Sequence, residues 1–480
     1  MKVPRITACV AMTLVVLGVA ATPTRAADVR ILVENGLVFT MKPGDDAPFI
    51  GFVAIGQDGR ILSVGRGKPP ADLQAGTVLD ASGKFIIPGF ISAHSHIWQT
   101  ANRGVGASGT LNAWWTACSR YIEATTPEDL YWYTLHGSLD FIKSGITTAY
   151  NFTFDGSRWT GYNGPAVAPI PGPWEAEQFR GEIDSGMRFV HSFAVPYFDT
   201  PEKNHAKVVE FINFTKAYAS NPAFLKLSIQ GTVAFATDKS WAKVEAAYMK
   251  EFGLDNEMHM FEPPDVADQT EKFHWLEEAG MLGPQLFFGH FIHVTPAIVE
   301  EVGHAGSNMV WQPLSNGRLG SGVADIPRCL KAGMQIGMGV DDQAASDVPD
   351  PFENMRTGLY AIRDKYESAT ILGPKDVLRF HTIGSATVMH VADKVGSLEA
   401  GKFGDFLVIN PLDRDIGPIY DPYASLVLAC TQMNLEQVYI GGVLVSERGK
   451  LIGKDFSRAS AEVHRRSEAI RDRLDGKAAN

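Results

Sequence analysis

The feature that most constrains this 480-residue chain is a regular alternation of short β-rich runs with amphipathic helical segments through its middle. Strands that alternate with helices predict βαβ units and a parallel sheet. The segment Pro127–Lys143 shows the helical pattern, since it follows Thr126 as an N-cap candidate and begins with proline and an acid. The predicted strands are Phe85–His96, Ile146–Phe152, Met187–Val195, Phe224–Val233, Glu257–Phe261, Gln285–His290, Asn308–Gln312 and Gln335–Asp341.

Eight strand–helix units over residues 85–391 predict an α/β fold, a (β/α)8 TIM-like barrel, whose usual size of about 250 residues this span fits. A doubly wound open sheet is the structural alternative. The sequence has no G-x-G-x-x-G or P-loop pattern to support that alternative.

Both ends of the mature chain are rich in short strands and tight turns. Residues 27–84 contain the hairpin signals Glu34–Gly36 and Gln57–Gly59, and residues 392–455 contain further strands around Gly441-Gly442. We expect the two ends to pair into one small composite β-sandwich domain. Residues 456–480 are highly charged and predict a C-terminal helix on the surface.

The first 26 residues have the pattern of a secretory signal peptide. Lys2 and Arg5 precede an apolar run, Ala8–Ala21, which is too short to span a bilayer comfortably, and Thr24–Ala26 offers a cleavage site. A membrane anchor or a buried first helix is the alternative. We expect an exported protein, periplasmic or secreted, without membrane contact after cleavage.

The net charge limits the classes of partner that we expect, and the cysteines leave the question of a disulfide open. The formal net charge is −11, and removal of the three basic residues of the signal makes it −14. An acidic chain without a basic stripe argues against nucleic acid as a partner. Three cysteines remain after cleavage, far apart in sequence, so whether two of them form a disulfide stays open, as does a homo-oligomeric state. The residues are Cys118, Cys329 and Cys430.

Polar side chains of metal-binding type follow four of the predicted strands. In an extended strand His94 and His96 project to the same face, and the carboxyl ends of barrel strands converge on one rim. Taken singly, each residue has an ordinary structural explanation, such as an aspartate that caps the following helix. Taken together, these ordinary explanations would require four independent coincidences, one for each strand. The residues are His94 and His96, then His259 and Glu262, then His290, and finally Asp341 and Asp342.

These motifs, in this order, resemble the amidohydrolase superfamily, in particular its cytosine deaminase-like and chlorohydrolase-like branch of metal-dependent hydrolases. The resemblance covers nearly the whole mature chain. The motifs are Pro88–His96 (PG-x4-HxH), His259–Glu262 (HxxE), Gly289-His290, Ser315-Asn316, Gly339–Ser346 (GxDxxAS-like) and Gly396–Val408 in the composite domain.

The resemblance implies that His94, His96, His259 and Asp341 bind one divalent metal ion, with zinc favoured and iron as the alternative. It implies that His290 contacts the attacking water or the tetrahedral intermediate, that Glu262 shuttles a proton, and that Asp341 also accepts one. No lysine suited to carboxylation ends strand four, so we expect a mononuclear site. Such a site activates water for attack on an sp² carbon.

Candidate substrate contacts are less specific. Trp98, Arg103 and Trp115 follow the first strand closely and are candidates for the pocket mouth. Trp311 stands where the branch often has histidine, so a residue of the pocket wall is replaced, and Asn316 belongs to the SN motif. Aromatic walls suggest a planar ring substrate.

We therefore expect an exported metal-dependent hydrolase that cleaves a C–N bond of a small molecule, by deamination or amine release from a heteroaromatic or amidine-like carbon. An amidase or carbamate hydrolase, acting on an amide, carbamate or lactam-type substrate, is the alternative within the class. A binding protein on a barrel that has lost catalysis is a third interpretation, against which the intact ligand set argues.

Overall fold

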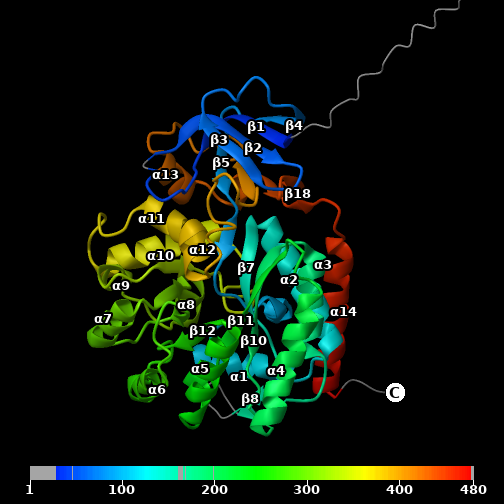
Figure 1. Ribbon diagram of the computed structural model, residues 1–480, viewed down its shortest axis with the longest axis vertical. Coiled ribbons are helices and arrows are strands. Elements are labelled where there is room, and N and C mark those ends of the chain that lie inside the picture. Colours follow the sequence, from blue (N-terminus) through cyan, green and yellow to red (C-terminus); the bar gives the residue numbers. More distant parts are fainter. Residues whose placement is uncertain (1–28, 46, 160–165, 168, 198, 477–480) are drawn as a thin grey trace, which may run out of the picture.

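The computed structural model describes residues 29–45, 47–159, 166–167, 169–197 and 199–476. The predicted signal peptide therefore lies outside the described residues. In Figure 1 a sheet built from both ends of the chain lies above a larger ring of strands and helices. Among the described residues, no helix has the length and apolar character needed to cross a membrane.

The larger part is a parallel eight-stranded sheet in which the strands lie in chain order. Its edges meet just beyond the first and last strands, where Ala93 donates a backbone hydrogen bond to Met338 (3.0 Å) and Ser95 bridges in parallel to Asp341. The sheet therefore closes, and the predicted (β/α)8 barrel is confirmed. Its strands are β6 (Phe90–Ser92), β7 (Ile146–Phe152), β10 (Arg188–Ala194), β11 (Phe224–Gly231), β12 (Asp255–Met260), β13 (Leu286–His290), β14 (Asn308–Trp311) and β15 (Ile336–Met338).

Helices surround the barrel on the outside (Figure 1), and the buried apolar side chains of its strands belong to one large core. Strands β7 and β13 are buried at every residue, as expected for parallel strands with both faces covered. The helices of this part are α1 (Leu111–Ile122), α2 (Pro127–Lys143), α3 (Trp174–Ser185), α4 (Pro201–Lys216), α5 (Ser240–Phe252), α6 (Val266–Glu278), α7 (Pro296–Ala305), α8 (Pro313–Leu319), α9 (Ile326–Lys331), α10 (Pro351–Lys365), α11 (Pro374–Arg379) and α12 (Ser385–Val388).

Local sequence explains where many of these helices begin. Helix α2 starts as predicted, because the Thr126 side chain accepts from the Asp129 backbone while the Asp129 carboxylate accepts from the Thr126 backbone. Helices α4 and α7 likewise have a threonine N-cap followed by proline. Short 3-10 or π segments complete the connections: η1 (Ile97–Asn102), η2 (Val233–Phe235), η3 (Phe380–Gly384), η4 (Ser425–Ala429) and η5 (Gln432–Asn434), with the small hairpin β8 (Arg158–Trp159) and β9 (Ala166–Val167).

The two ends of the chain form one nine-stranded sheet, which confirms the predicted composite domain. The hairpin that joins β2 to β3 contacts the C-terminal segment, where Ile61 donates to the Lys402 carbonyl and Gly404 donates to the Gly59 carbonyl, both at 2.8 Å. A separate apolar core fills this part. Its strands are β1 (Val29–Val38), β2 (Phe49–Gly56), β3 (Ile61–Arg66), β4 (Ala75–Asp80), β5 (Phe85–Pro88), β16 (Phe406–Ile409), β17 (Leu435–Ile440), β18 (Val443–Glu447) and β19 (Lys450–Leu451), with the short helix α13 (Pro422–Ala424).

The predicted strand Phe85–His96 is divided in the structure. Its first part, β5, belongs to the composite sheet between β1 and β16, and its second part, β6, opens the barrel. The break falls at Gly89, where a Cβ atom would lie 2.0 Å from Oγ1 of Thr147. Only glycine fits at this crossing from one sheet to the other. Because β5 belongs to the composite sheet, the barrel begins at residue 90 rather than 85.

The C-terminal helix α14 (Phe456–Leu474) lies along α2 (Figure 1). Arg466 anchors it, because its guanidinium bonds to Asp129 at 2.8 Å and to Glu128. The three cysteines of the described residues are buried free thiols rather than a disulfide.

Candidate metal centre and active-site pocket

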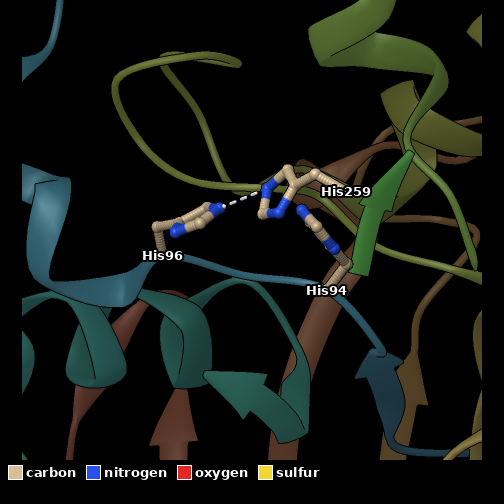
Figure 2. A group of neighbouring side chains, drawn as sticks. All are labelled: His94, His96 and His259. Carbon is tan, nitrogen blue, oxygen red and sulfur yellow. Dashed lines mark hydrogen bonds between the residues drawn. The ribbon is translucent and has the colours of Figure 1, made fainter. Parts of the chain in front are cut away.

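Three histidines from two strand ends converge at the carboxyl rim of the barrel. His94 and His96 follow β6 and His259 lies in β12, and Figure 2 shows their rings turned toward one another. The Nε2 atoms of His96 and His259 are 3.0 Å apart. Nitrogen ligands about 2.0–2.1 Å from one zinc ion are separated by about 3–3.5 Å, so this spacing suits a shared cation.

His94 is the most deeply buried member of the group. Its Nδ1 bonds to Oε1 of Glu257 at 2.7 Å, and both side chains are fully buried. Its Nε2 has no hydrogen-bond partner among the described residues. A buried polar atom without a partner costs roughly 1–3 kcal/mol, so this nitrogen requires a ligand that the protein itself does not supply.

Asp341 completes the group from the opposite side of the barrel seam. Its Oδ1 lies 3.6 Å from Nε2 of His94 and 3.8 Å from Nε2 of His96. Its backbone N–H donates to the His94 carbonyl at 3.2 Å, so the bond that closes the barrel also places this carboxylate. Asp341 and His290 both have left-handed backbones, with φ of 63° and 64°. Such conformations are uncommon for residues other than glycine and cluster at functional sites.

The donor set fits one divalent metal ion. Burial is the main cause that lowers the pKa of His94, His96 and His259 well below the ordinary value, so these imidazoles are neutral, which is their metal-binding form. Burial, and then the charge of Glu262, raises the pKa of Asp341 to about 7, and a cation beside the carboxylate acts in the opposite direction. Three imidazoles and one carboxylate are typical of zinc.

His290 and Glu262 stand beside this group. Nδ1 of His290 bonds to the amide of Asn316 at 2.7 Å and lies 3.5 Å from Oε1 of Glu262. Ser321 donates to the same carboxylate oxygen at 3.1 Å. Burial lowers the pKa of His290 to about 3, so its ring is neutral. With Asn316 donating to Nδ1, the proton of His290 lies on Nε2, and this N–H is available to an oxygen bound beside the metal ligands.

The neighbouring Asp342 plays a different part. Its Oδ1 accepts from the backbone N–H groups of Ala344 and Ala345 and so fixes the loop after β15. This is the capping role that an aspartate at a strand end can always have. Of the two adjacent acids, Asp341 therefore contacts the metal ligands and Asp342 holds the loop.

A deep pocket opens above the metal ligands and encloses about 1000 Å³ of empty space, including its solvent-facing part. Its lining includes seven tryptophan, tyrosine or phenylalanine residues: Trp98, Trp114, Trp115, Phe154, Tyr197, Phe235 and Trp241. Trp98 stacks on Phe154 with ring centroids 5.1 Å apart, and Phe152, which is fully buried outside the lining, stacks on His96 at the same distance. Trp98 is fixed by a hydrogen bond from its Nε1 to the Phe152 carbonyl (2.8 Å). Trp98 and Trp115 thus line the pocket, as predicted from their positions.

Three other candidates have different surroundings. Arg103 lies outside the pocket lining and pairs with Asp140 at 2.5 Å. Trp311 is fully buried in the barrel wall, where a Cβ on Gly358 would meet its ring at 2.7 Å. Asn316 lies behind His290 rather than in the pocket lining. The structure therefore places Arg103, Trp311 and Asn316 outside the lining of this pocket, and substrate contact by any of the candidates stays a prediction.

Sequence reasoning missed Glu257, the partner of His94. Glu257 and His259 are two residues apart in β12 and therefore share a strand face, which is a signal that the sequence contained. It also missed Gln312, whose Oε1 accepts from the backbone of His290 at 2.8 Å. Gln312 stands beside the substituted Trp311, and nothing in the sequence indicates this contact.

The fold and the site together define a TIM-barrel hydrolase with a mononuclear metal centre. A family model for the amidohydrolase family matches residues 85–445, and the chain belongs to this family. It is a metal-dependent hydrolase that acts on carbon–nitrogen bonds other than peptide bonds in small molecules. The predicted cofactor, one divalent metal ion, is confirmed by the family together with the histidine cluster.

Relatives and solved structures agree with this assignment. The chain is 28% identical over 439 residues to a 5-methylthioadenosine/S-adenosylhomocysteine deaminase of Syntrophobacter fumaroxidans, covering 88% of this chain and 94% of the relative. A zinc-bound adenosine deaminase from Xanthomonas campestris superposes with a TM-score of 0.79 at 20% identity, covering 92% and 99% of the two chains. An atrazine chlorohydrolase of Arthrobacter aurescens complexed with zinc gives 0.79 at 18% identity, covering 91% and 100%.

Proposed function

We propose that this protein is an exported deaminase that hydrolyses the bond between a ring carbon and an exocyclic amino group of a planar heteroaromatic molecule, releasing ammonia. The observation that supports this proposal most directly is the position of the aromatic walls. Trp98 and Phe154 stack on each other in the pocket lining, and the metal ligands His96 and His259 line the same pocket. The other aromatic residues of the lining are Trp114, Trp115, Tyr197, Phe235 and Trp241. A flat ring that packs against these side chains lies beside the metal ligands.

Each polar group has a step to perform. His94, His96, His259 and Asp341 would hold one divalent cation, which would supply a bound water whose pKa is lowered from 15.7 toward about 7. Asp341 accepts the proton of the attacking water. Nε2–H of His290 donates to the developing negative charge. Glu262, held by Ser321, carries a proton to the leaving nitrogen. Because the site is buried, these interactions are stronger than they would be in water.

The names of the relatives support deamination. The relative reported above is a nucleoside-type deaminase, and one solved structure is an adenosine deaminase. The chlorohydrolase among the solved structures is named for atrazine, a ring compound. We therefore place the reaction at an aromatic carbon rather than at an amide or carbamate carbonyl.

A substrate panel tests the reaction. Zinc-loaded protein would be incubated with aminopurines, aminopyrimidines, aminotriazines, simple amides and carbamates, and the products would be identified by mass spectrometry together with an ammonia assay. We expect ammonia and the oxo-substituted ring from at least one amino-substituted ring, and no product from His290→Ala. An acid and an amine as products would instead assign an amidase or carbamate hydrolase. Binding without turnover of any compound would contradict catalysis.

Export has its own test, because the signal peptide rests only on residues 1–26. The full-length chain would be expressed in a Gram-negative bacterium and fractionated. We expect mature protein outside the cytoplasm whose N-terminal residue is Ala27. A chain that keeps Met1 and stays in the cytoplasmic fraction would contradict export and leave the proposed reaction untouched.

A further inference from the structure

Building on the proposed function, we propose that the part of the active-site pocket around Asp155 is a cation subsite. There, Asp155 binds an ammonium, amidinium or guanidinium group of the substrate. The proposal names the substrate class of the pocket: a planar ring that carries a positively charged, hydrogen-bond-donating substituent. It rests on the distribution of charge in the pocket, on the support of Asp155 and on unpartnered polar atoms nearby.

The pocket lining contains acids but no lysine or arginine among the described residues. Glu262, Asp341 and Asp342 belong to the reaction centre, where a divalent cation balances their charge. Asp155 is the remaining acid of the lining and has no cation to balance it there. The undescribed residues 160–165 include no lysine or arginine, and Arg158 is exposed and does not line the pocket. The part of the pocket around Asp155 therefore carries negative charge and disfavours phosphate or carboxylate groups.

The backbone around Asp155 is held firmly. Gln178, which is fully buried, bonds to both sides of Phe154: its Oε1 accepts from the Phe154 N–H at 3.0 Å and its Nε2 donates to the Phe154 carbonyl at 2.8 Å. Oδ1 of Asp155 accepts from the Ser157 N–H at 2.9 Å, which fixes the carboxylate in a turn. A carboxylate already fixed in place loses little entropy when a ligand binds.

The surroundings of Asp155 suit a cation. Burial raises the pKa of Asp155, and the nearby charge of Glu175 adds to this, so the carboxylate is poorly solvated and faces a like charge. The stacked rings of Trp98 and Phe154 line the same pocket, and aromatic faces attract cations that lie over them. A cation that pairs with Asp155 beside these rings gains from both interactions.

A second, independent observation indicates an unfilled polar subsite in this pocket. Gln99 lines the pocket, is 1% exposed, and its Oε1 has no hydrogen-bond partner among the described residues. Oε1 of Gln230, also in the lining, is likewise without a partner in that part of the chain. Buried polar atoms of this kind are normally satisfied, so the pocket is built for a ligand with several polar groups.

There is also room for whatever is attached to the cation. Asp155 and Ala194 line the active-site pocket and a second cavity, which is bounded by Pro169–Trp174 and by helix α4. The carboxylate thus stands where the two cavities meet. The one lysine in the lining of the second cavity, among the residues that the structure describes, is Lys207, and it is paired with Asp199 at 2.6 Å.

Binding of an isosteric pair of probes tests the subsite without turnover. Phenylguanidinium and the neutral phenylurea would be titrated into the zinc-loaded protein by isothermal titration calorimetry. We expect phenylguanidinium to bind at least about tenfold more tightly to the wild-type protein. In Asp155→Asn this ratio should fall to about one, mainly through weaker binding of the cation. The matched control is Asp238→Asn, since Asp238 holds Ser240 in the same kind of turn (2.8 Å) away from the pocket.

The outcomes separate this inference from the proposed function. An unchanged ratio in Asp155→Asn, or equal affinities in the wild type, would overturn the cation subsite even if the enzyme deaminates rings. The expected ratio and its loss would support the subsite even if no ring amine is hydrolysed. Circular dichroism checks the folding of each variant. If Asp155→Asn does not fold, Asp155→Glu decides instead: it should keep the preference for the cation, and equal affinities of this variant for the two probes would overturn the subsite.

Discussion

Two buried charge clusters lie at opposite ends of the barrel, and they differ in what the protein leaves unsatisfied. At the amino end, Arg188 of β10 pairs with Asp405, which joins the barrel to the composite sheet. At the carboxyl end, His94 pairs with Glu257 beneath the candidate metal centre. Each cluster ties together residues more than 150 positions apart in sequence.

The amino-end cluster is closed. Arg188 bonds to both oxygens of Asp405 at 2.6 and 2.8 Å, and its third nitrogen donates to the Pro222 carbonyl at 2.7 Å. The Gly441 N–H completes the carboxylate at 2.7 Å, and the guanidinium lies 3.6 Å over the Phe403 ring. A cluster with every partner supplied internally has no capacity for a ligand, so its role is to hold the two domains together.

The carboxyl-end cluster is open. Nε2 of His94 and Oε2 of Glu257 lack partners among the described residues, and Asp341 and His290 have strained backbones beside them. The difference matches the division of labour in TIM barrels, where one end serves stability and the other chemistry. Both clusters are buried, so burial does not distinguish them. The polar atoms without a hydrogen-bond partner indicate which end of the barrel is functional.

Removing the metal, or its most buried ligand, should have the largest effect. We expect a chelator, or His94→Ala, to lower kcat/KM by about 10³-fold or more, because several kcal/mol of charge stabilisation is lost. Metal content by mass spectrometry and activity would be measured together. The control is His205→Ala, a surface histidine paired with Glu251, which should change neither. Full activity in metal-free protein would contradict the assignment of the open cluster.

Breaking the closed cluster should cost stability instead. We expect Arg188→Ala to lower the free energy of unfolding by about 3–5 kcal/mol, because it leaves the buried Asp405 carboxylate without its cation. Denaturant titration measures this loss, and kcat of the folded fraction should be unchanged. Arg188→Lys keeps the charge but not the bidentate geometry, so its free energy of unfolding should lie between those of the wild type and Arg188→Ala. A large drop in kcat with unchanged stability would reverse the roles assigned to the two ends.

The sequence indicated the histidines and Asp341 of the open cluster, but it indicated neither Glu257 nor the pairing in the closed cluster. Histidines and acids at strand ends are recognisable because few residue types bind metals, and their order along the chain resembles one family. Arg188 carries no such signal, since an arginine at the start of a strand is ordinary, and the motif Gly396–Val408 contains Asp405 without indicating its partner. Their pairing depends on how the composite sheet docks on the barrel, which no local pattern encodes.

Local steric fit explains the other differences. The run Phe85–His96 has the pattern of one strand, yet it crosses between two sheets at Gly89, where Thr147 leaves no room for a side chain. Arg103 is close to the metal ligands in sequence, yet η1 directs it toward Asp140. In both cases the deciding contact comes from a residue more than 30 positions away.

Weakening the support of a metal ligand sharpens the comparison further. We expect Glu257→Gln to lower metal affinity by about 10–100-fold, because Glu257 fixes the orientation of His94 and makes its ring more basic. Competition with a chelator of known affinity measures the change. At saturating metal most of the activity should return, in contrast to His94→Ala. Unaltered metal affinity would show that Glu257 does not support metal binding and that the His94–Glu257 pair has a structural role, as the Arg188 cluster has.

The smallest effect is expected for Asn316, and its replacement tests whether the hydrogen bond to His290 contributes to catalysis. We expect Asn316→Ala to lower kcat by about 5–10-fold with little change in KM, because loss of one hydrogen bond to Nδ1 frees the ring to turn. The control is Asn434→Ala, a buried asparagine of the composite domain whose amide donates to the Asn410 and Arg414 carbonyls, both at 3.0 Å. That variant should lose stability and keep kcat. If both variants change only stability, the hydrogen bond from Asn316 to His290 has a structural role and does not contribute to catalysis.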